Sequence, residues 1–214
     1  MQSKEEKMKS YEFDEIATNV FGEAYPIIVR QAIEKTEISE GTCIDLGCGG
    51  GHLGIALAEN TDANMKVYLY DIQQDAIDIC NARIKEKRLE SKVEAVRGNV
   101  ESISLEDNSV DLVISRGSLW FWEDKVKAFK EIYRILKNGG KTYIGGGFGC
   151  KELREQINKE MLERNSETWK KGKIKKKADD TKNNILKILK SASIDRFEIV
   201  DDDSGYWIII SKEE

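Results

Sequence analysis

The sequence predicts an α/β fold in which a mostly parallel, doubly wound sheet is covered by helices. Two observations support this prediction. Short apolar runs alternate along the chain with segments whose apolar residues recur every three or four positions, as in parallel strands joined by helices. Near the end of the chain, two strand-like runs are separated only by a short Asp/Ser/Gly turn, which leaves no room for a helix. The last strand is therefore expected to be antiparallel.

The individual elements follow from these patterns. Five strands are expected near residues 41–46, 65–71, 92–97, 109–115 and 140–145. The stretches "DRFEIVDD" and "GYWIIISK" supply the two strands of the terminal hairpin. Helical periodicity covers residues 73–89 and 123–137. The second helix is expected to stop at Asn138-Gly139-Gly140, so that Lys137 complements the negative end of its dipole.

The chain reads as one domain over residues 1–214. Its single proline, Pro26, provides no stiff linker, and no internal repeat divides it. Two helical additions are expected, a lid over residues 1–36 at the N-terminal end and an insertion over 148–192.

Composition and charge exclude several classes of protein. The formal net charge is −5, and no apolar run approaches the ~20 residues of a membrane span. The first ten residues lack the apolar core of a signal peptide, so we expect a cytoplasmic protein with no membrane partner. Four cysteines lack paired metal-ligand spacing and His52 is the only histidine, so reduced thiols and no metal are expected.

The stretch "CIDLGCGGGHLGIALAE", residues 43–59, carries the main functional signal. It runs from a strand through four glycines into a helix, which exposes backbone N–H groups where a large polar ligand can approach. Gly49-x-Gly51-x-x-Gly54 matches the dinucleotide fingerprint, and Asp71 follows at the end of the next strand, where an acid holds ribose hydroxyls. Asp45, two residues before the first glycine, would repel a pyrophosphate but suits a cationic amino group.

These motifs together resemble the class I S-adenosylmethionine-dependent methyltransferases, which have a Rossmann-like fold. "DLGCGGG" resembles their first motif, "RGNV" at 97–100 their adenine-contacting motif, and "LKNGGK" at 136–141 their glycine turn. The resemblance implies S-adenosyl-L-methionine as cofactor and methyl transfer by in-line displacement. It departs from the family at Asn99, which often is aspartate, although an amide oxygen also accepts a hydrogen bond from adenine. It departs again at Asn138, which often is proline.

The resemblance and the residue patterns nominate two sets of site residues. The cofactor set is Tyr11, Asp45, Gly47, Cys48, Gly49, Gly51, Asp71, Ile72, Asn99, Val100 and Arg116. The substrate set is Arg116, Trp120, Phe121, Trp122 and Phe148. Tyr11 and Trp120 are expected to place aromatic faces near the sulfonium.

The substrate set comes mostly from "SRGSLWFWED", residues 115–124, which follows a strand at the carboxyl edge of the sheet. Arg116 suits a carboxylate or phosphate, and three adjacent aromatics cannot all enter the core. Glu123 and Asp124 fit the first turn of the following helix. "IGGGFG" at 144–149 is expected to let backbone approach a ligand closely.

The acceptor is expected to be a small molecule enclosed by the lid, the loop after residue 115 and the insertion. Alternatives remain open: an RNA or protein acceptor, a nicotinamide-dependent oxidoreductase suggested by Tyr133-x-x-x-Lys137, or cofactor binding without turnover. The basic run 170–177 lacks interleaved aromatics, which disfavours nucleic acid. His52 is expected to be a packed helix-starting residue rather than a catalyst, and the sequence offers no convincing general base.

Overall fold

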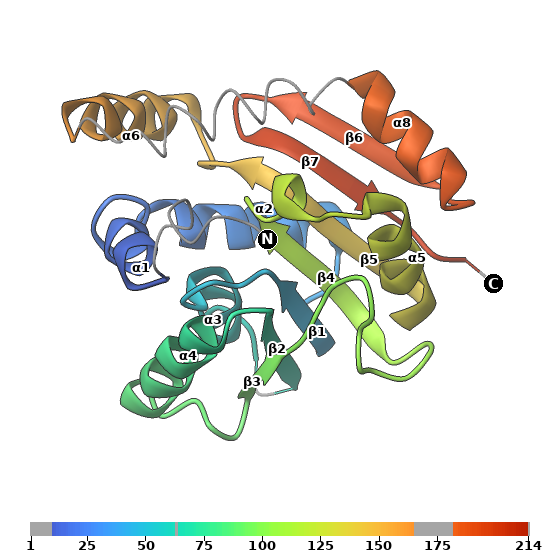
Figure 1. Cartoon of the computed structure of the whole chain (residues 1–214), viewed down its shortest axis with the longest axis horizontal. Helices are drawn as coiled ribbons and strands as arrows, with labels where there is room; N and C mark the ends of the chain where they lie inside the picture. The colour runs from blue at the N-terminus through green and yellow to red at the C-terminus, as the bar shows by residue number, and fades with distance from the viewer. Residues whose placement is uncertain (1–9, 63, 165–181, 214) are drawn as a thin grey trace, which may run out of the picture.

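A computed structural model describes residues 10–62, 64–164 and 182–213 of the chain. Their centre is a seven-stranded sheet with the order β3-β2-β1-β4-β5-β7-β6 (Figure 1). The strands are β1 Gly41–Leu46, β2 Met65–Asp71, β3 Val93–Arg97, β4 Val110–Arg116, β5 Leu136–Gly147, β6 Phe197–Asp202 and β7 Gly205–Ile210. β1 and β2 have the predicted bounds, and β3 and β4 differ from them by one residue.

The direction of the strands confirms the predicted fold class. β1 pairs in parallel with β2 and β4, and β4 pairs in parallel with β5. β7 is antiparallel to both β5 and β6, as the short turn between the last two strands requires. The carboxyl ends of β1, β2 and β4 therefore meet at one edge, where a doubly wound sheet binds its ligands.

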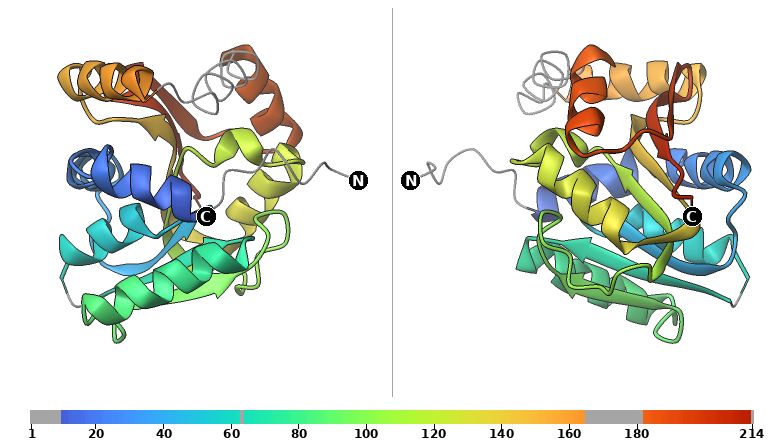
Figure 2. Two further views of the ribbon diagram at one scale, coloured as in Figure 1. Left: turned by 60° about the vertical axis from the view of Figure 1, so that its left-hand side comes forward. Right: turned by 90° about the vertical axis from the view of Figure 1, so that its right-hand side faces the viewer.

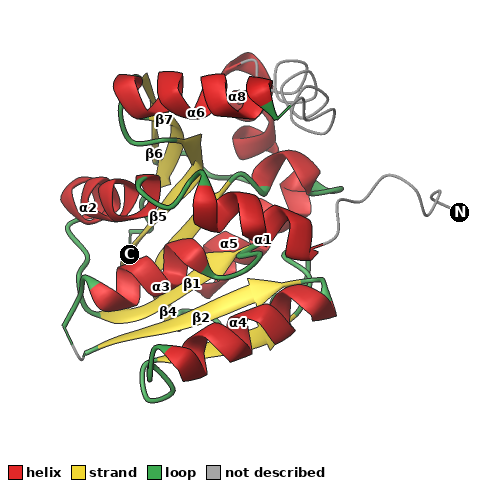
Figure 3. Cartoon of the chain, turned by 90° about the vertical axis from the view of Figure 1, so that its left-hand side faces the viewer, coloured by secondary structure: helices red, strands yellow, loops and turns green. Residues whose placement is uncertain are grey.

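Helices cover both faces of the sheet. They are α1 Ser10–Asn19, α2 Ala24–Thr36, α3 His52–Glu59, α4 Gln74–Glu86, α5 Lys125–Ile135, α6 Lys151–Glu163 and α8 Lys182–Ser191, with a short 3-10 helix at Leu119–Phe121. Figure 3 shows α2, α3 and α4 in front of the sheet, and the right-hand view of Figure 2 shows α5 and α8 on the opposite side. Each face has its own apolar core, one around Leu57 and Leu69 and the other around Phe129 and Leu189.

The segment predicted as an insertion, 148–192, contributes a helix to each face. α6 packs Leu153, Ile157 and Met161 into the core that also contains the buried side of α2, whereas α8 packs Ile185 and Leu189 into the core beside α5. The basic run 170–177 and Trp169 lie outside the described residues.

The predicted end of the helix before β5 is wrong. α5 ends at Ile135 and β5 begins at the next residue, Leu136. A register shift follows in the pairing of β5 with β4, and Gly139 supplies the left-handed backbone conformation there, with φ of 83°. Lys137 is therefore a strand residue whose ammonium lies 2.7 Å from the Asp111 carboxylate, and it does not complement a helix dipole.

Candidate functional site

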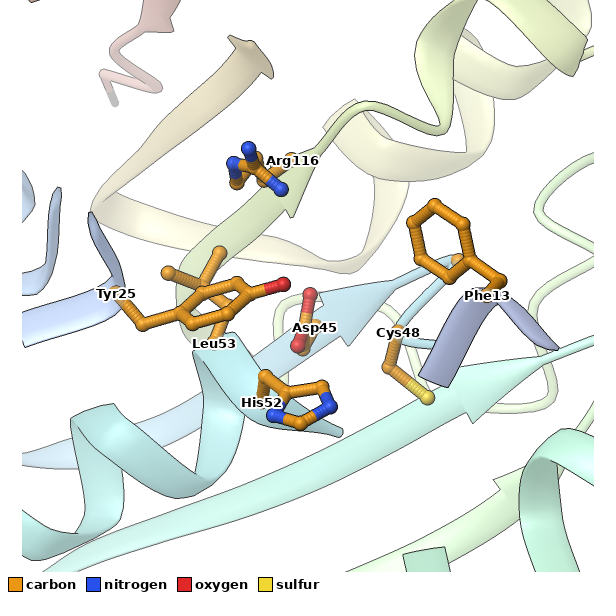
Figure 4. Close-up of a pocket in the computed structure, with 8 residues that line it drawn as sticks. Phe13, Tyr25, Asp45, Cys48, His52, Leu53 and Arg116 are labelled. Carbon is orange, nitrogen blue, oxygen red and sulfur yellow. The ribbon is translucent and has the colours of Figure 1, made fainter. Parts of the chain in front are cut away.

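A small cavity lies at the carboxyl ends of β1 and β4 (Figure 4). Its volume is about 30 Å³, which is room for about one water molecule. Eight residues line it: Phe13, Tyr25, Asp45, Gly47, Cys48, His52, Leu53 and Arg116. Four of these, Asp45, Gly47, Cys48 and Arg116, belong to the predicted cofactor set. The structure thus brings together the end of β1, the glycine loop and the end of β4.

Asp45 is the acid at the base of this cavity. It is only 2% exposed, and its Oδ2 accepts a hydrogen bond from the Gly54 N–H at 2.9 Å. Burial raises the pKa of Asp45 to about 7, and the charge of Asp71 adds to this rise, although the Gly54 N–H opposes it. A cationic group placed in the cavity would favour the ionised form of Asp45.

The glycine loop does not present the row of free N–H groups that its sequence predicts. The N–H groups of Gly47 and Cys48 both donate to the Tyr70 carbonyl. The Gly49 N–H donates to Asp71 Oδ2 at 2.9 Å, and the Gly51 N–H donates to the Cys48 carbonyl. These four donors stabilise the turn between β1 and α3, so that they are not available to cradle a phosphate.

The glycines of the loop are required for different reasons. Gly47, Gly49 and Gly51 all have positive φ, which favours residues without a Cβ. A Cβ on Gly47 would collide with the Ser118 side chain, and one on Gly51 would lie 2.7 Å from Leu69. A Cβ on Gly49 would meet only Phe13, at an ordinary 3.7 Å. Of these three, Gly49 is the glycine at which a Cβ would meet the least crowding.

Cys48 contributes backbone to the cavity, while its sulfur turns toward α4. Cys48 Sγ lies 3.8 Å from Cys80 Sγ, and Cys80 Sγ lies 3.1 Å from the Gly49 carbonyl oxygen. Both cysteines are free, as are Cys43 and Cys150, in accord with the expected reduced thiols.

Asp71 and Ile72 lie beside the loop at the end of β2. Asp71 is 8% exposed and accepts hydrogen bonds from two N–H groups, those of Gly49 and Gln73. The N-cap residue of α4 is Gln73, and Asp71 couples the glycine loop to the end of β2. Ile72 follows it with a side chain that is 54% exposed, an apolar surface at the edge of the sheet.

The predicted adenine contacts follow β3. Asn99 is exposed, and its Oδ1 accepts a hydrogen bond from the Glu101 N–H at 2.9 Å. Val100 is half-buried against the α5 side of the sheet. The amide oxygen therefore holds its own loop, and it retains capacity for a second hydrogen bond.

Arg116 ends β4 inside an aromatic cage. Its guanidinium carbon lies 4.9 Å, 5.3 Å and 4.8 Å from the ring centres of Phe21, Tyr25 and Phe148. Its Nε donates to the Gly147 carbonyl at 2.9 Å. Burial lowers the pKa of Arg116, and within the described parts of the chain no carboxylate forms an ion pair with it. The site therefore holds a shielded cation that a bound anion would stabilise.

The three aromatic side chains that follow Arg116 lie in different environments. Trp122 is a core residue whose ring packs edge-on against Phe129, 5.7 Å away, and whose Nε1 donates to Ser118 Oγ. Trp120 is 7% exposed and lies over Gly146. Phe121 is 66% exposed. Asp124 caps α5 by accepting from the Lys127 N–H, which confirms its predicted role at the first turn.

The glycines of β5 pack against protein, contrary to the predicted approach of a ligand. A Cβ on Gly145 would collide with the Tyr206 carbonyl of β7, and one on Gly147 would collide with the Ser204 carbonyl. A Cβ on Gly146 would lie 2.7 Å from the Trp120 ring. This run lets β7 and Trp120 lie close to β5. Phe148, directly after it, contacts Phe21 with ring centres 5.5 Å apart.

Four lining residues lie outside the predicted cofactor and substrate sets. Phe13 on α1 and Tyr25 on α2 were missed, whereas His52 and Leu53 directly follow the glycine loop, and His52 begins α3 as expected. Tyr11 was predicted on the pocket, but it is 62% exposed and is absent from the lining, where Phe13 takes its place. The helical period could have suggested this exchange, since residues two apart on a helix point in different directions.

His52 has partners that its local sequence does not reveal. Its Nε2 lies 2.9 Å from Asp14 Oδ1, and its ring stacks on Tyr25 at 5.1 Å with 13° between the planes. Burial lowers the pKa of His52 to about 4, and the charge of Arg83 acts in the same direction. The imidazole is therefore neutral at physiological pH.

A family model described as a methyltransferase domain matches residues 38–193. A protein of Methanococcus maripaludis, whose crystal structure is described as that of an S-adenosyl-L-methionine-dependent methyltransferase, superposes with a TM-score of 0.90. It is 41% identical, and the match covers 100% of this chain and 98% of that one. An Aquifex aeolicus methyltransferase structure is 18% identical with a TM-score of 0.69, over 95% and 97% of the two chains, and shows the fold alone.

Curated relatives match over part of their length. The ubiquinone/menaquinone biosynthesis C-methyltransferase UbiE of Hydrogenovibrio crunogenus is 32% identical, over 65% of this chain and 59% of that protein. The demethylmenaquinone methyltransferase of Lactobacillus johnsonii is 30% identical, over 54% and 48%. This chain thus spans half to three fifths of these relatives.

The described residues contain no group of three side chains suited to a metal ion, and none of their helices is both long and apolar enough to span a bilayer. The family match extends over most of the chain. The order of the strands, the acid near the end of β1 and the glycines that follow it agree with that match. The chain belongs to the class I S-adenosyl-L-methionine-dependent methyltransferases.

Proposed function

We propose that this protein transfers a methyl group from S-adenosyl-L-methionine to a small-molecule acceptor. The observation that carries the proposal is the pairing of Asp45 and Arg116 in one cavity. Figure 4 displays the carboxylate and the guanidinium on different walls of the same space. An α-amino acid carries an ammonium and a carboxylate on one carbon, and the two walls complement those charges. The amino-acid end of the cofactor fits here.

The adenosine end of the cofactor fits the residues beyond the cavity. Asp71 already accepts two N–H groups, and its carboxylate has further acceptor capacity for ribose hydroxyls. The exposed side chain of Ile72 offers an apolar surface for the adenine ring, and Asn99 and Val100 follow the neighbouring strand. These assignments rest on the order of β1, β2 and β3 at the edge of the sheet.

The role of Arg116 was expected to be either cofactor or acceptor binding, and we favour the cofactor carboxylate. Arg116 shares its cavity with Asp45 and Gly47, next to the glycine loop. Its Nε is held by the Gly147 carbonyl and its guanidinium interacts with the Tyr25 hydroxyl, which orients the terminal nitrogens to meet an anion in bidentate fashion. An acidic group on the acceptor is the alternative.

When bound, the cofactor supplies an electrophilic methyl group on a sulfonium. The protein then acts by alignment and by excluding water, which accounts for much of the rate of such displacements. Phe13 and Leu53 line the cavity with apolar groups, while Tyr25, Asp45 and Arg116 hold the donor. His52 is neutral and bonded to Asp14, and we assign it no role as a base.

A small-molecule acceptor is supported by the enclosure of the site. α1 lies against the glycine loop through Phe13, and Phe21, Phe148 and Trp120 form aromatic walls around Arg116 and β5. One curated relative is named for ubiquinone/menaquinone biosynthesis and the other for demethylmenaquinone, and quinones are small organic molecules. The unbridged cysteines agree with a reducing, cytoplasmic setting.

The nicotinamide alternative is disfavoured by the same geometry. Four N–H groups of the glycine loop are occupied within the protein, and a buried carboxylate stands where a pyrophosphate would lie. Lys137, of the Tyr133–Lys137 pair, is bonded to Asp111 next to the first residue of β4, away from the carboxyl edge.

Calorimetry with S-adenosylmethionine, S-adenosylhomocysteine and NAD tests the proposal. We expect the first two to bind and NAD to show no measurable binding. Arg116→Lys should weaken S-adenosylhomocysteine about tenfold or more, because a lysine cannot reproduce the bidentate contact. The same substitution should change the affinity for 5′-methylthioadenosine, which lacks the amino-acid end, by no more than about twofold. Binding of NAD alone would contradict the proposed function. Unchanged binding of S-adenosylhomocysteine by the variant would mean that Arg116 binds the acceptor rather than the cofactor.

A further inference from the structure

The carboxylate of Asp14 ties α1 to the glycine loop. Asp14 Oδ1 lies 2.9 Å from His52 Nε2 and 3.0 Å from Arg83 Nη1, and Asp14 Oδ2 lies 2.9 Å from Arg83 Nη2. Arg83 also donates to the Gly50 carbonyl. All three side chains are at most 17% exposed. A bidentate and largely shielded pair of this kind is stronger than an ion pair on an open surface.

Apart from Asp14, few side chains anchor α1. Its fully buried residues are Ser10 and Ala17, both small, while Ile16 is partly buried against the core and Phe13, 41% exposed, meets the Phe21 ring edge-on at 6.4 Å. Burial of small side chains contributes little hydrophobic free energy. The position of α1 over the loop therefore depends strongly on Asp14.

His52 contacts both Asp14 and Tyr25. Since the imidazole is neutral, its Nε2–H donates to Asp14, and this bond fixes the plane of the ring. The Tyr25 ring lies nearly parallel to it, and the Arg116 guanidinium lies 5.3 Å from the same ring. Figure 4 shows the Tyr25 hydroxyl directed into the cavity toward Asp45.

The state of the Tyr25 hydroxyl suits a hydrogen bond to an anion. Burial raises the pKa of Tyr25 despite the nearby charge of Arg116, so the phenol keeps its proton at physiological pH. It lies in the cavity that also holds Asp45 and Arg116. A neutral phenol there can donate to the same carboxylate that Arg116 binds.

We propose that Asp14 is a positioning residue that, through His52, holds the Tyr25 hydroxyl against the amino-acid end of the cofactor. The cofactor pocket is then complete only when α1 is closed over the glycine loop. The proposal rests on the proposed function, because it takes the cavity to be the site of that amino-acid end. The cavity of about 30 Å³ is small for an amino-acid moiety and Phe13 of α1 lines it, so we expect α1 to shift outward to admit the cofactor and then to close against it.

A double-mutant cycle tests the connection, with calorimetric affinities for S-adenosylhomocysteine and 5′-methylthioadenosine as the readout. Tyr25→Phe and Asp14→Asn should each weaken S-adenosylhomocysteine about three- to tenfold, the value of one hydrogen bond. The double variant should be no weaker than the weaker single variant. Binding of 5′-methylthioadenosine should stay within about twofold throughout. Glu12→Gln, which neutralises an exposed carboxylate on the same helix, should change neither affinity.

A second variant covers the case in which Asp14→Asn does not fold because Arg83 loses its partner. His52→Ala removes the stack on Tyr25 but keeps the Asp14–Arg83 pair, and it should reproduce the loss seen for Tyr25→Phe. Additive losses in the cycle, or equal weakening of both ligands, would overturn the proposal. If the unmodified protein bound neither S-adenosylhomocysteine nor S-adenosylmethionine, the proposed function itself would fail.

Discussion

Asp45 shows at the scale of one residue how a binding site is built at a cost to stability. A carboxyl group whose pKa is raised to about 7 by burial is harder to ionise in the folded chain than in the unfolded chain. Its contribution to stability is therefore present at low pH, below the unfolded pKa of ~3.9, and is lost as pH rises toward 7. Each pKa unit of difference corresponds to about 1.4 kcal/mol. A cationic ligand reverses this loss by favouring the ionised form.

Asp45→Asn should therefore raise stability and weaken binding. Asparagine keeps an oxygen for the Gly54 N–H but carries no charge. At pH 8 the ligand-free variant should unfold at a higher temperature than the natural protein, and the difference should shrink toward pH 4. Its affinity for S-adenosylhomocysteine should fall about tenfold or more, as expected for a lost charged hydrogen bond.

The pH dependence of binding provides the control for Asp45. In the natural protein, affinity for S-adenosylhomocysteine should decrease as pH falls below 7, because Asp45 takes up a proton. The variant should lack this decrease. The charged groups that face Asp45 include Asp71 and Arg116, so retention of the same pH profile in the variant would assign the titration to a neighbour and contradict the assignment.

Residue by residue, the sequence predicted those parts of the candidate site that lie within one motif. Asp45, Gly47 and Cys48 are contiguous with the glycine loop, and an acid directly before such a loop indicates a ligand with a cationic group. Phe13 and Tyr25 could not be found in this way, since neither belongs to such a motif. They reach the cavity only because α2 packs against α3, and α1 packs against α4 and the glycine loop.

At the scale of the element, β5 shows why glycines were misread. The run Gly145–Gly147 suggested space for a ligand, whereas each missing side chain is replaced by Tyr206, Trp120 or Ser204. Hydrophobic periodicity locates a strand but does not reveal which neighbour lies against its faces. The same limit applies to Gly139, which marks a bulge inside β5 rather than the end of α5.

Alanine substitutions in β5 test this packing account. Gly145→Ala should lower the melting temperature strongly, because its Cβ meets the backbone of β7, which cannot move without breaking the ladder. Gly146→Ala should cost less, about 1 to 3 kcal/mol, because its Cβ meets the Trp120 ring, which can shift. The stability of both variants is measured by thermal and urea unfolding. Equal and small effects would mean that β5 has open space beside it and that its glycines do face a ligand.

At the scale of the whole molecule, stability is distributed unevenly between the sheet and the parts that cover the site. β1, β4 and β5 are paired on both sides and buried between two cores. The fully buried residues of α1, Ser10 and Ala17, are small, and the helix is held largely by the Asp14 contacts. Local opening draws on the weakly packed parts first, so ligand entry through α1 requires no opening of the sheet.

Hydrogen exchange with and without S-adenosylhomocysteine should reveal this division. A ligand present at about a hundred times its Kd stabilises the folded state by about 2.7 kcal/mol, which for a chain of this size raises the melting temperature by roughly 5 to 10 °C. Without ligand, the amides of α1 should exchange far faster than those of β1 and β4, because α1 opens locally. With ligand, the largest gain in protection should fall on α1 and residues 47–51, where closure and the cavity coincide. Protection that rises equally over the whole chain would show that α1 opens only when the sheet unfolds, and the account of α1 as a separately opening lid would then be wrong.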